Sequence, residues 1–217
     1  MSSSAISKDI EVVFFDLEGT GLMQEDQIVQ IAAKSGSKSF SVYILPTCQF
    51  KPDASAMTGL TLFGNKLYLK SVAVPTKSRI DAITEFITFL RGVGLKVMLA
   101  AHGGSKYDFP KILRLVKQLN MMNEFSSVVC GFIDTFTLLR SKLRTRFLLY
   151  RSFSQVNLAK DYLGLYCTSN AHNALVDVEV LERIINCSRI DLTREEILKS
   201  AVSIQEFQRS YRGEYTI

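Results

Sequence analysis

The sequence has little or none of several residues and patterns that mark specialised proteins. Its 217 residues include no Trp, only two His and only four Pro. No apolar run approaches the roughly 18–20 residues that a membrane-spanning helix needs. The four Cys form no CxxC pair, and no apolar signal core follows the N-terminus. We therefore expect an intracellular protein, cytoplasmic or nuclear, with reduced thiols and no membrane contact.

The residues that are present are typical of a globular protein. Hydrophobic residues make up 47% of the chain and charged residues 22%, which excludes disordered and collagen-like proteins. The sequence has no internal repeat, low-complexity tract or flexible linker, so we expect a single domain over residues 1–217. The net charge of +5 and the pI near 9.0 favour anionic partners such as nucleic acid, although many basic proteins bind none.

Hydrophobic periodicity predicts a mixed α/β fold. Apolar strands are expected at residues 10–15, 27–34 and 38–45, and the short polar connections between them indicate an antiparallel meander. After a loop, helices and strands alternate, and then only helices follow, which implies a mixed sheet. The later elements expected are a helix at 78–91 that ends at Gly92, a strand at 95–101, a helix from Pro110 to about 119, a strand at 128–133 and a last helix at about 193–210 that begins with a Thr193–Glu196 capping box.

Asp16 and Glu18 lie two residues apart at the end of the first strand. In an extended backbone, residues i and i+2 point to the same face, so both carboxylates project together. Two neighbouring anions are costly unless a cation lies between them, although a solvated strand end would have the same spacing. The run at residues 16–20 also resembles the DxDGT motif of haloacid-dehalogenase-like phosphatases. Glu18 stands where that motif has Asp, and the closing acidic pair of that family has no counterpart downstream, which disfavours a phosphatase.

Two further acids lie in positions that favour a functional site. Asp108 comes two residues before Pro110, where it either satisfies a helix N-terminus or joins a site at the strand ends. Asp177 falls within the apolar stripe of a helix that Asn173 can cap, and a carboxylate in such a stripe needs a cation or hydrogen-bond donors. His172 comes just before this helix, where a structural role is the alternative to a catalytic one.

These residues occur in three motifs: Asp16-x-Glu18, then Ala101-His102-Gly103-Gly104-x-x-Tyr107-Asp108, then His172-x4-Asp177. Their order, spacing and placement resemble the three exonuclease motifs of the DEDDh family, the DnaQ-like branch of the RNase H-like fold, over residues 9–190. Within that family the chain is most similar to the three-prime repair exonucleases, and it also resembles the exonuclease-like domain of promyelocytic leukaemia protein. The resemblance implies an RNase H-like mixed sheet, with three antiparallel first strands, flanked by helices.

Two shorter segments carry the same resemblance, and two positions depart from it. Met57-Thr58-Gly59-Leu60 resembles the Thr-Gly-Leu substrate segment of the repair exonucleases, and Ile133-Asp134-Thr135 resembles their Val-Asp-Thr segment. The family usually has Asn where Gly103 stands, and Ala or Thr where Gly19 stands. The departure at Gly103 concerns local substrate contacts, and no catalytic position is missing.

The resemblance implies a metal-dependent 3′–5′ exonuclease that releases nucleoside 5′-monophosphates from DNA or RNA. Its cofactors would be two Mg²⁺ or Mn²⁺ ions, which suit hard oxygen ligands, and the lack of clustered Cys or His argues against zinc. Asp16 would bridge both ions, Glu18 and Asp177 would hold the first, and Asp108 would assist directly or through water. His172 would be the general base.

The same resemblance places the 3′ end of a nucleic acid, preferably single-stranded, in the site. Gly19 and Thr20 would hold the terminal 3′-hydroxyl. Leu60 would wedge against the last bases, while Met57 and Tyr107 would line the base pocket. For these three residues, ordinary apolar packing is the alternative. His102 is expected to support the Asp108 loop rather than to bind metal.

A basic segment at residues 140–151 is a further candidate. Its cations, interleaved with Phe147 and Tyr150, suit a surface that follows a nucleic-acid strand, but a solvated face or a protein-binding patch would have the same composition. The five cations are Arg140, Lys142, Arg144, Arg146 and Arg151. Because the catalytic set is intact, an exonuclease is favoured over an idle exonuclease-like domain that serves as a binding module. The sequence does not separate DNA from RNA, or single from double strands, because a two-metal site contacts phosphates that both polymers share.

Overall fold

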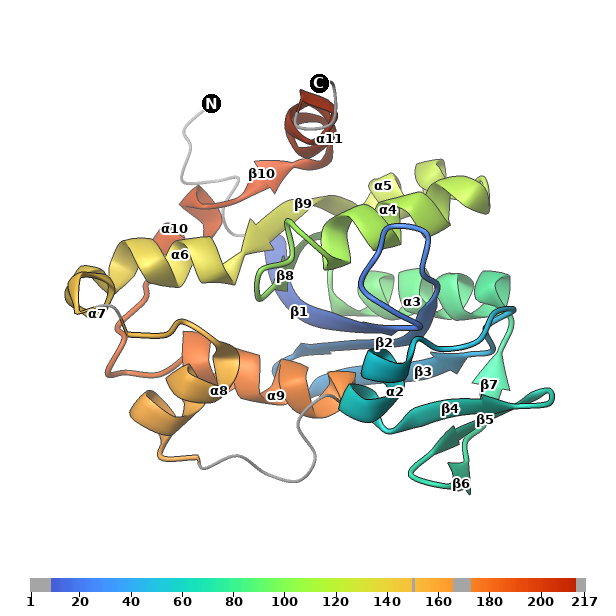
Figure 1. Ribbon diagram of the computed structural model, residues 1–217. Helices are drawn as coiled ribbons and strands as arrows, with labels where there is room; N and C mark the ends of the chain where they lie inside the picture. The colour runs from blue at the N-terminus through green and yellow to red at the C-terminus, as the bar shows by residue number, and fades with distance from the viewer. Residues whose placement is uncertain (1–8, 150, 166–172, 214–217) are drawn as a thin grey trace.

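The computed structural model describes residues 9–149, 151–165 and 173–213, as helices packed on both faces of a central sheet (Figure 1). The strands are β1 (Ile10–Gly19), β2 (Ile28–Ser35), β3 (Lys38–Ile44), β4 (Leu60–Phe63), β5 (Lys66–Leu69), β6 (Val72–Ala73), β7 (Thr76–Lys77), β8 (Lys96–Ala101), β9 (Val129–Asp134) and β10 (Val202–Ser203). The helices are α2 (Pro52–Thr58), α3 (Arg79–Val93), α4 (Asp108–Gln118), α5 (Met122–Val128), α6 (Thr135–Lys142), α7 (Arg144–Leu148), α8 (Gln155–Leu158), the π-helix η1 (Ala159–Leu163), α9 (Ala174–Ile185), α10 (Arg194–Lys199) and α11 (Ile204–Gly213).

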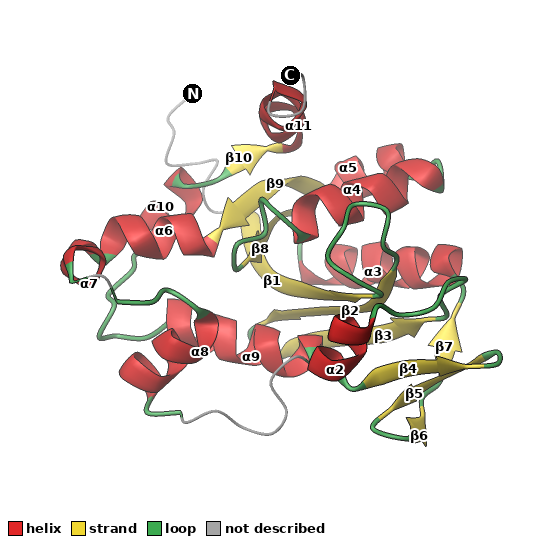
Figure 2. Ribbon diagram, viewed as in Figure 1, coloured by secondary structure: helices red, strands yellow, loops and turns green. Residues whose placement is uncertain are grey.

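The main sheet confirms the predicted mixed topology. Among the described residues it has seven strands in the order β10-β9-β8-β1-β2-β3-β7. β1, β2 and β3 are antiparallel neighbours, whereas β8 lies parallel to β1 and β9 lies parallel to β8 (Figure 2). The antiparallel meander and the helix-connected parallel strands therefore meet at β1, in the middle of the sheet.

Strand β1 separates two apolar cores, because successive side chains of a strand point to opposite faces. Val13, Phe15 and Leu17 belong to the core beneath α3, α4 and α5. Phe14, on the other face, packs in a second core with residues of α6, α8 and α9. The alternation places Asp16 and Glu18 on the α9 face, where the apolar pattern of the strand is interrupted.

The connection between β3 and α3, expected as a loop, contains a second small sheet. Strands β4, β5 and β6 form an antiparallel ladder, and α2 precedes them. Its apolar core is small and consists of Val29, Leu60 and Leu67. The strands are two to four residues long, so their alternation was too short to distinguish from a turn-rich loop.

The C-terminal helix predicted at 193–210 is instead two helices with a strand between them. The Thr193–Glu196 capping box starts α10 as expected. The chain then pairs with the edge of the sheet through β10, where Val202 lies opposite Phe132 of β9. Ser203 and Glu206 form a second reciprocal cap that starts α11. The helix at 78–91 also continues through Gly92 and ends at Val93.

Within the described residues, the helices are too short or too polar to cross a membrane. Cys48, Cys130 and Cys187 are free thiols, and Cys167 lies outside the described residues. The compartment of the protein stays a prediction.

Candidate metal centre

The last residues of β1 present two carboxylates on one face of the sheet. Asp16 and Glu18 pair with Ala32 and Gln30 of β2, and both side chains are half-buried. The register shifts between Glu18 and Gly19, because Gly19 lies opposite Ile28 and Val29 is an extra residue on β2. Such a bulge interrupts the ladder, so the two acids stand where regular pairing ends.

Helix α9 brings the third carboxylate, Asp177, to the same place. Asn173 caps the helix through its side chain, which accepts the Leu175 N–H. Gln30 of β2 is buried, and its Oε1 accepts the Ala174 N–H at 3.3 Å. The Gln30 amide also lies 3.5 Å from Asn173 Oδ1. β2 thus fixes the first turn of α9 and, with it, Asp177.

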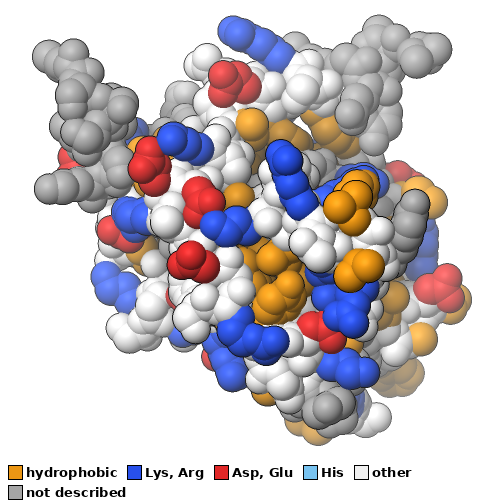
Figure 3. Space-filling model, turned by 90° about the vertical axis from the view of Figure 1, so that its left-hand side faces the viewer, with side chains coloured by type: hydrophobic (Ala, Val, Ile, Leu, Met, Phe, Trp, Pro, Cys, Tyr) orange, Lys and Arg blue, Asp and Glu red, His pale blue; other side chains and the backbone are white. Residues whose placement is uncertain are grey.

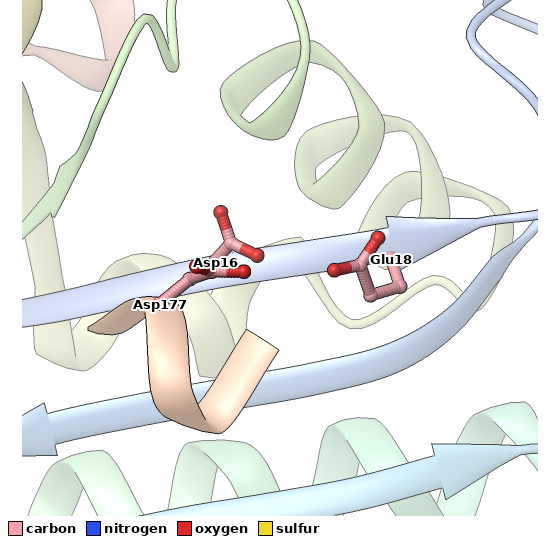
Figure 4. A group of neighbouring side chains, drawn as sticks. All are labelled: Asp16, Glu18 and Asp177. Atoms are coloured by element: carbon pink, nitrogen blue, oxygen red, sulfur yellow. The ribbon is translucent and has the colours of Figure 1, made fainter. Parts of the chain in front are cut away.

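The carboxylates of Asp16, Glu18 and Asp177 converge on one small volume (Figure 4). One oxygen of each lies within 4.8 Å of the other two. Oxygen atoms at this spacing can contact one cation together, and carboxylate oxygen is the ligand that Mg²⁺ and Mn²⁺ prefer. The donor set therefore fits a divalent ion, as the sequence predicted, without identifying which ion.

The protein environment makes these negative charges costly. Burial, followed by repulsion from Asp108, Glu18 and Asp177, holds the pKa of Asp16 well above its usual range. Burial and the charge of Asp177 raise the pKa of Glu18 to about 8. Protonation of the carboxylates relieves this repulsion when no metal is bound. A bound divalent cation would relieve it at neutral pH without protonation.

Asp108 borders this group without belonging to the trio. It is the first residue of α4, 4% exposed, and its Oδ1 accepts the Leu17 N–H at 3.1 Å. Burial raises its pKa to about 7, against the opposing effect of the Leu17 hydrogen bond. Both interpretations offered by the sequence are visible: Asp108 is tied to backbone amides, and its charge also acts on Asp16.

Asp134 holds the loop that precedes Asp108. Its carboxylate accepts the N–H groups of Gly103 and Ser105, both at 3.1 Å, and caps α6. Gly103 has φ of +72°, in the left-handed region where Gly is unstrained and Asn is the next most tolerated residue. The replacement of Asn by Gly at this position therefore preserves the loop conformation.

The turn after Glu18 is closed by internal contacts. The Thr20 N–H donates to Gln27 O at 2.9 Å, and its buried hydroxyl accepts the Gln27 N–H. The Tyr107 hydroxyl donates to Gly21 O at 3.3 Å, and a Cβ on Gly19 would lie 2.4 Å from that hydroxyl. Glycine at position 19 therefore makes room for Tyr107. Thr20 is buried and bonded within this turn, and its predicted contact with a 3′-hydroxyl stays a prediction.

The segment at 57–60 divides into one exposed residue and one buried residue. Met57, on α2, is 51% exposed and has free surface for a substrate. Leu60 is 1% exposed and packs with Val29 and Leu67. The burial of Leu60 favours the apolar-packing alternative over the predicted wedge.

The structure describes the surroundings of one histidine, His102, but not those of His172. His172 lies outside the described residues, so its role stays a prediction. His102 binds the Phe153 carbonyl through Nε2 at 2.7 Å and the Thr135 hydroxyl through Nδ1 at 3.1 Å. Burial lowers its pKa. His102 thus connects the Asp108 loop to the segments after β9 and α7, in agreement with the predicted supporting role.

Sequence and structure comparisons place this architecture among known proteins. The family model of the Exuperantia RNase H-like domain matches residues 10–160, more than half of the chain. The chain belongs to the Exuperantia RNase H-like domain family. This membership agrees with the RNase H-like, DnaQ-like exonuclease resemblance of its motifs.

Two curated relatives illustrate the range of proteins that resemble this member of the Exuperantia RNase H-like domain family. Exonuclease DPD1 of Arabidopsis thaliana, named as chloroplastic/mitochondrial, is 25% identical over 202 residues, covering 86% of this chain and 58% of that protein. Maternal protein exuperantia of Drosophila melanogaster is 25% identical over 162 residues, covering 65% of this chain and 30% of that protein. The chain thus spans less than two thirds of either relative.

Solved structures show the same fold. A zinc-bound Escherichia coli ExoI–ssDNA complex matches with a TM-score of 0.61 and 16% identity, covering 84% of this chain and 41% of that chain. Exonuclease I from Methylocaldum szegediense matches with a TM-score of 0.61 and 15% identity, covering 81% and 40%. The RNase H-like exonuclease fold predicted from the motifs is confirmed.

The basic segment of this family member does not form one uniform surface. Arg146 is buried, donates to Ser152 O and forms an ion pair with Asp161 at 2.5 Å. Lys142 pairs with Glu196 at 2.8 Å. Arg140 stacks on Phe147, 4.3 Å from its ring centre. Arg146 therefore stabilises the fold, and whether the exposed cations of the segment contact nucleic acid stays a prediction.

Two residues position the site through contacts that the sequence did not indicate: Gln30, and Asp134 of the Ile133-Asp134-Thr135 segment. Gln30 is a lone buried amide in the apolar strand β2, and this interruption was its only sequence signal. Asp134 ends β9 and caps α6, and its contacts with the 103–105 loop became visible only in three dimensions.

Proposed function

We propose that this chain is a metal-dependent 3′–5′ exonuclease that hydrolyses phosphodiester bonds of DNA or RNA. The observation that carries the proposal is the convergence of the Asp16, Glu18 and Asp177 carboxylates, with Asp108 beside them. The exonuclease fold of the solved neighbours and the exonuclease relative from Arabidopsis support the same reaction class. An idle domain that only binds nucleic acid would have no need for four mutually repelling acids.

The carboxylates would hold two divalent cations, Mg²⁺ or Mn²⁺. Asp16 is repelled by Asp108, Glu18 and Asp177, and by the resemblance to the exonuclease motifs it would take part in holding both ions. Glu18 and Asp177 would hold one of them, and Asp108 would assist directly or through water. When bound, such ions lower the pKa of an attacking water and stabilise the charge of the departing oxygen.

The side chains of this protein would then manage the proton and the substrate. His172, just before α9, would take the proton from the water that attacks phosphorus, and its ordinary pKa near 6.5 suits a base at neutral pH. The bond between phosphorus and the 3′-oxygen of the preceding nucleotide breaks, which releases a nucleoside 5′-monophosphate. The preceding nucleotide retains a new 3′-hydroxyl, so the reaction can repeat.

The end of the strand would enter beside the turn after β1. Because Gly19 has no Cβ, the turn leaves room for the Tyr107 hydroxyl. Met57 lies on α2, just before β4, and its apolar side chain is exposed. We assign Gly19, Met57 and Tyr107 to the substrate and leave Leu60 and Thr20 to the fold.

The proposal is tested by digestion of 5′-labelled DNA and RNA, single-stranded and double-stranded, with Mg²⁺, Mn²⁺ or EDTA. We expect shortening from the 3′ end with either metal and none in EDTA. A 3′-phosphate and circular single strands should resist. Rapid cutting of circles, activity in EDTA, or binding without any cleavage would each contradict the proposal, and the last result would identify an idle binding module.

A further inference from the structure

A groove separate from the acidic trio runs along α6. It encloses about 840 Å³ between α6 and α7 on one side and α10 and β10 on the other. Its lining includes Ser105 and Asp134, in and beside the loop that carries Asp108. We call it the α6–α10 groove. The face of the molecule drawn in Figure 3 shows hydrophobic side chains at the base of a hollow, with Lys and Arg side chains around it.

The walls of the α6–α10 groove combine apolar surface with hydroxyl groups. Leu138, Leu192 and Val202 are among its apolar residues. Thr137, Ser141 and Thr145 also line it, at intervals of four residues along α6 and α7. Ligand sites of roughly 300–1,000 Å³ with apolar walls and a few polar groups are the size and character that bind small organic groups such as nucleotides.

The cations of the groove differ in how far they are engaged. Arg144 is exposed, and no carboxylate among the described residues lies within ion-pairing distance of it. Lys199 pairs only with Glu195 across an exposed turn of α10, with side chains 74% and 76% exposed. Exposed pairs of this kind contribute little, so the Lys199 ammonium can exchange partners at small cost.

The two acids that line the groove are already satisfied by donors. Asp134 accepts backbone N–H groups of the 103–105 loop and of α6. Glu196 accepts from Lys142 and from Thr193 in the capping box. The lining holds four cations, Lys142, Arg144, Arg146 and Lys199, against these two acids, so its net charge is positive and complements an anionic ligand.

We propose that the α6–α10 groove binds a single-stranded nucleic acid a few nucleotides away from the 3′ end that the acidic trio hydrolyses. Arg144 and Lys199 contact phosphates, hydroxyl groups of α6 and α7 contact the backbone, and the apolar residues contact bases or sugars. Because the lining includes Ser105 and Asp134 beside the Asp108 loop, a strand whose 3′ end lies at the acidic trio can continue into the groove, which favours a strand over a free nucleotide. The position of the strand rests on the proposed exonuclease function, but binding in the groove does not require cleavage.

The proposal divides the basic segment into two classes and supplies a matched control. The test variant is Arg144→Ser with Lys199→Ser, which removes two groove cations. The control is Arg140→Ser with Arg151→Ser, which removes two exposed cations of the segment that do not line the groove. Both pairs change the net charge equally, so a difference between them reports local contacts and not the general field of the protein.

The measurement is fluorescence anisotropy of labelled oligothymidylate, with Ca²⁺ in place of Mg²⁺, over a range of salt concentrations. A strand of about twenty nucleotides can fill both sites, whereas one of about four nucleotides fills only the acidic site, given typical site sizes of single-strand binding domains. The groove variant should bind the long strand on the order of tenfold more weakly, because two charge-assisted contacts are lost. Its log–log salt slope should flatten by roughly 0.7 per lost phosphate contact.

The short strand should bind the groove variant as it binds the wild type, and the control variant should bind both strands normally. With Mg²⁺, hydrolysis of the short strand should also be unchanged in the groove variant. The melting temperatures of the groove variant, the control variant and the wild type should agree, which excludes unfolding. If the wild type never cleaves but the groove variant still loses long-strand affinity, the groove proposal stands and the exonuclease proposal fails.

Equal affinity losses in the groove and control variants would overturn the proposal, because only general charge would then matter. An unchanged salt slope in the groove variant would overturn it as well. Polyglutamate is added as a competitor of the same charge type. Competition equal to that of unlabelled oligothymidylate would assign the groove to acidic protein segments instead of nucleic acid.

Discussion

The acidic trio and the basic segment at 140–151 show opposite relations between sequence and structure. The acids of the trio lie on two elements far apart in the chain, yet their spacing predicted that they would meet. The basic cations lie within twelve residues of each other, yet they separate in the structure. Arg146 is buried, Lys142 is paired, Arg140 stacks on a ring, and Arg144 faces a groove.

The difference follows from what each type of residue can tolerate. A buried carboxylate beside others is stable only with a cation or strong donors, so its place in an apolar strand or helix face has few interpretations. A Lys or Arg has a long flexible stem and satisfies itself in solvent, on a ring or with one acid, so the same residue type fits several environments. The position of an acid in an apolar pattern therefore predicts its environment well, whereas the clustering of cations in the sequence does not predict where each cation lies.

The largest effect is expected for Asp16→Asn, which removes the central charge of the trio. Cleavage should fall on the order of 10³-fold or more, the scale of several kcal/mol of lost transition-state stabilisation. The metal-free variant should melt at a higher temperature than the wild type, because repulsion with Asp108, Glu18 and Asp177 is relieved. Mg²⁺ should raise the melting temperature of the wild type more than that of the variant. Glu11→Gln, on the same strand and partly exposed, is the control. Full activity of Asp16→Asn would contradict the metal centre.

His172→Ala tests the proposed general base, which lies outside the described residues. Its kcat should fall on the order of 10²- to 10⁴-fold, the usual contribution of a general base. Mg²⁺ should still stabilise the variant, since His172 is not assigned as a ligand. The wild-type rate should decline as pH falls below the pKa of the imidazole, near 6.5 when unperturbed, and the variant should lose this limb. Wild-type turnover of His172→Ala between pH 6 and 8 would make His172 structural.

Gln30→Leu tests how β2 positions the helix that carries Asp177. The Ala174 N–H loses its acceptor in a buried place, so the free energy of unfolding should fall by about 1–3 kcal/mol. Stabilisation by Mg²⁺ should fall as well, because the first turn of α9 is less firmly held. Ser41→Ala removes another hydrogen-bond partner of Gln30 and leaves Ala174 paired, so it should have a smaller effect. Denaturant unfolding with and without Mg²⁺ measures both quantities, and equal effects of the two variants would contradict this role.

Arg146→Ser and Arg140→Ser separate the structural cation from an exposed cation of the same segment. Arg146→Ser removes the bonds to Ser152 O and Asp161 and should lower the melting temperature by several degrees, where about 1 kcal/mol corresponds to 2–4 °C in a chain of this length. Arg140→Ser should leave the melting temperature nearly unchanged. Thermal unfolding followed by circular dichroism is the measurement. An unchanged melting temperature in Arg146→Ser would return this residue to the set of nucleic-acid candidates.

The smallest effect concerns pH and the Lys142–Glu196 pair. The hydrogen bond from Lys142, with the capping contacts of Thr193, lowers the pKa of Glu196 from 4.5 to about 2. A carboxyl with a lowered folded-state pKa stabilises the fold above its unfolded pKa and loses that contribution as pH falls through the folded value. The stability of the wild type should therefore decline between pH 4.5 and 2 more steeply than that of Glu196→Gln. Parallel curves for the two proteins would show that this pair contributes nothing measurable.

The sequence by itself determined the central elements and the members of the acidic set. Alternation along residues 10–18 gave the strand and the common face of Asp16 and Glu18, and the Asn173 cap gave the helix of Asp177. These are local patterns with periods of 2 and 3.6 residues, which the backbone imposes wherever they occur.

Tertiary structure alone decided which residues support and approach the site. It buried Leu60 in a small core, closed Thr20 into a turn, bound Gln30 to the first turn of α9, and inserted β10 between two helices. It also distributed five neighbouring cations among a core, a ring, two acids and a groove. Each outcome depends on partners between 7 and 144 residues away in the chain. Such contacts are determined by packing and by the need to satisfy hydrogen bonds in the folded protein, and the helix and strand periodicities of the sequence do not predict them.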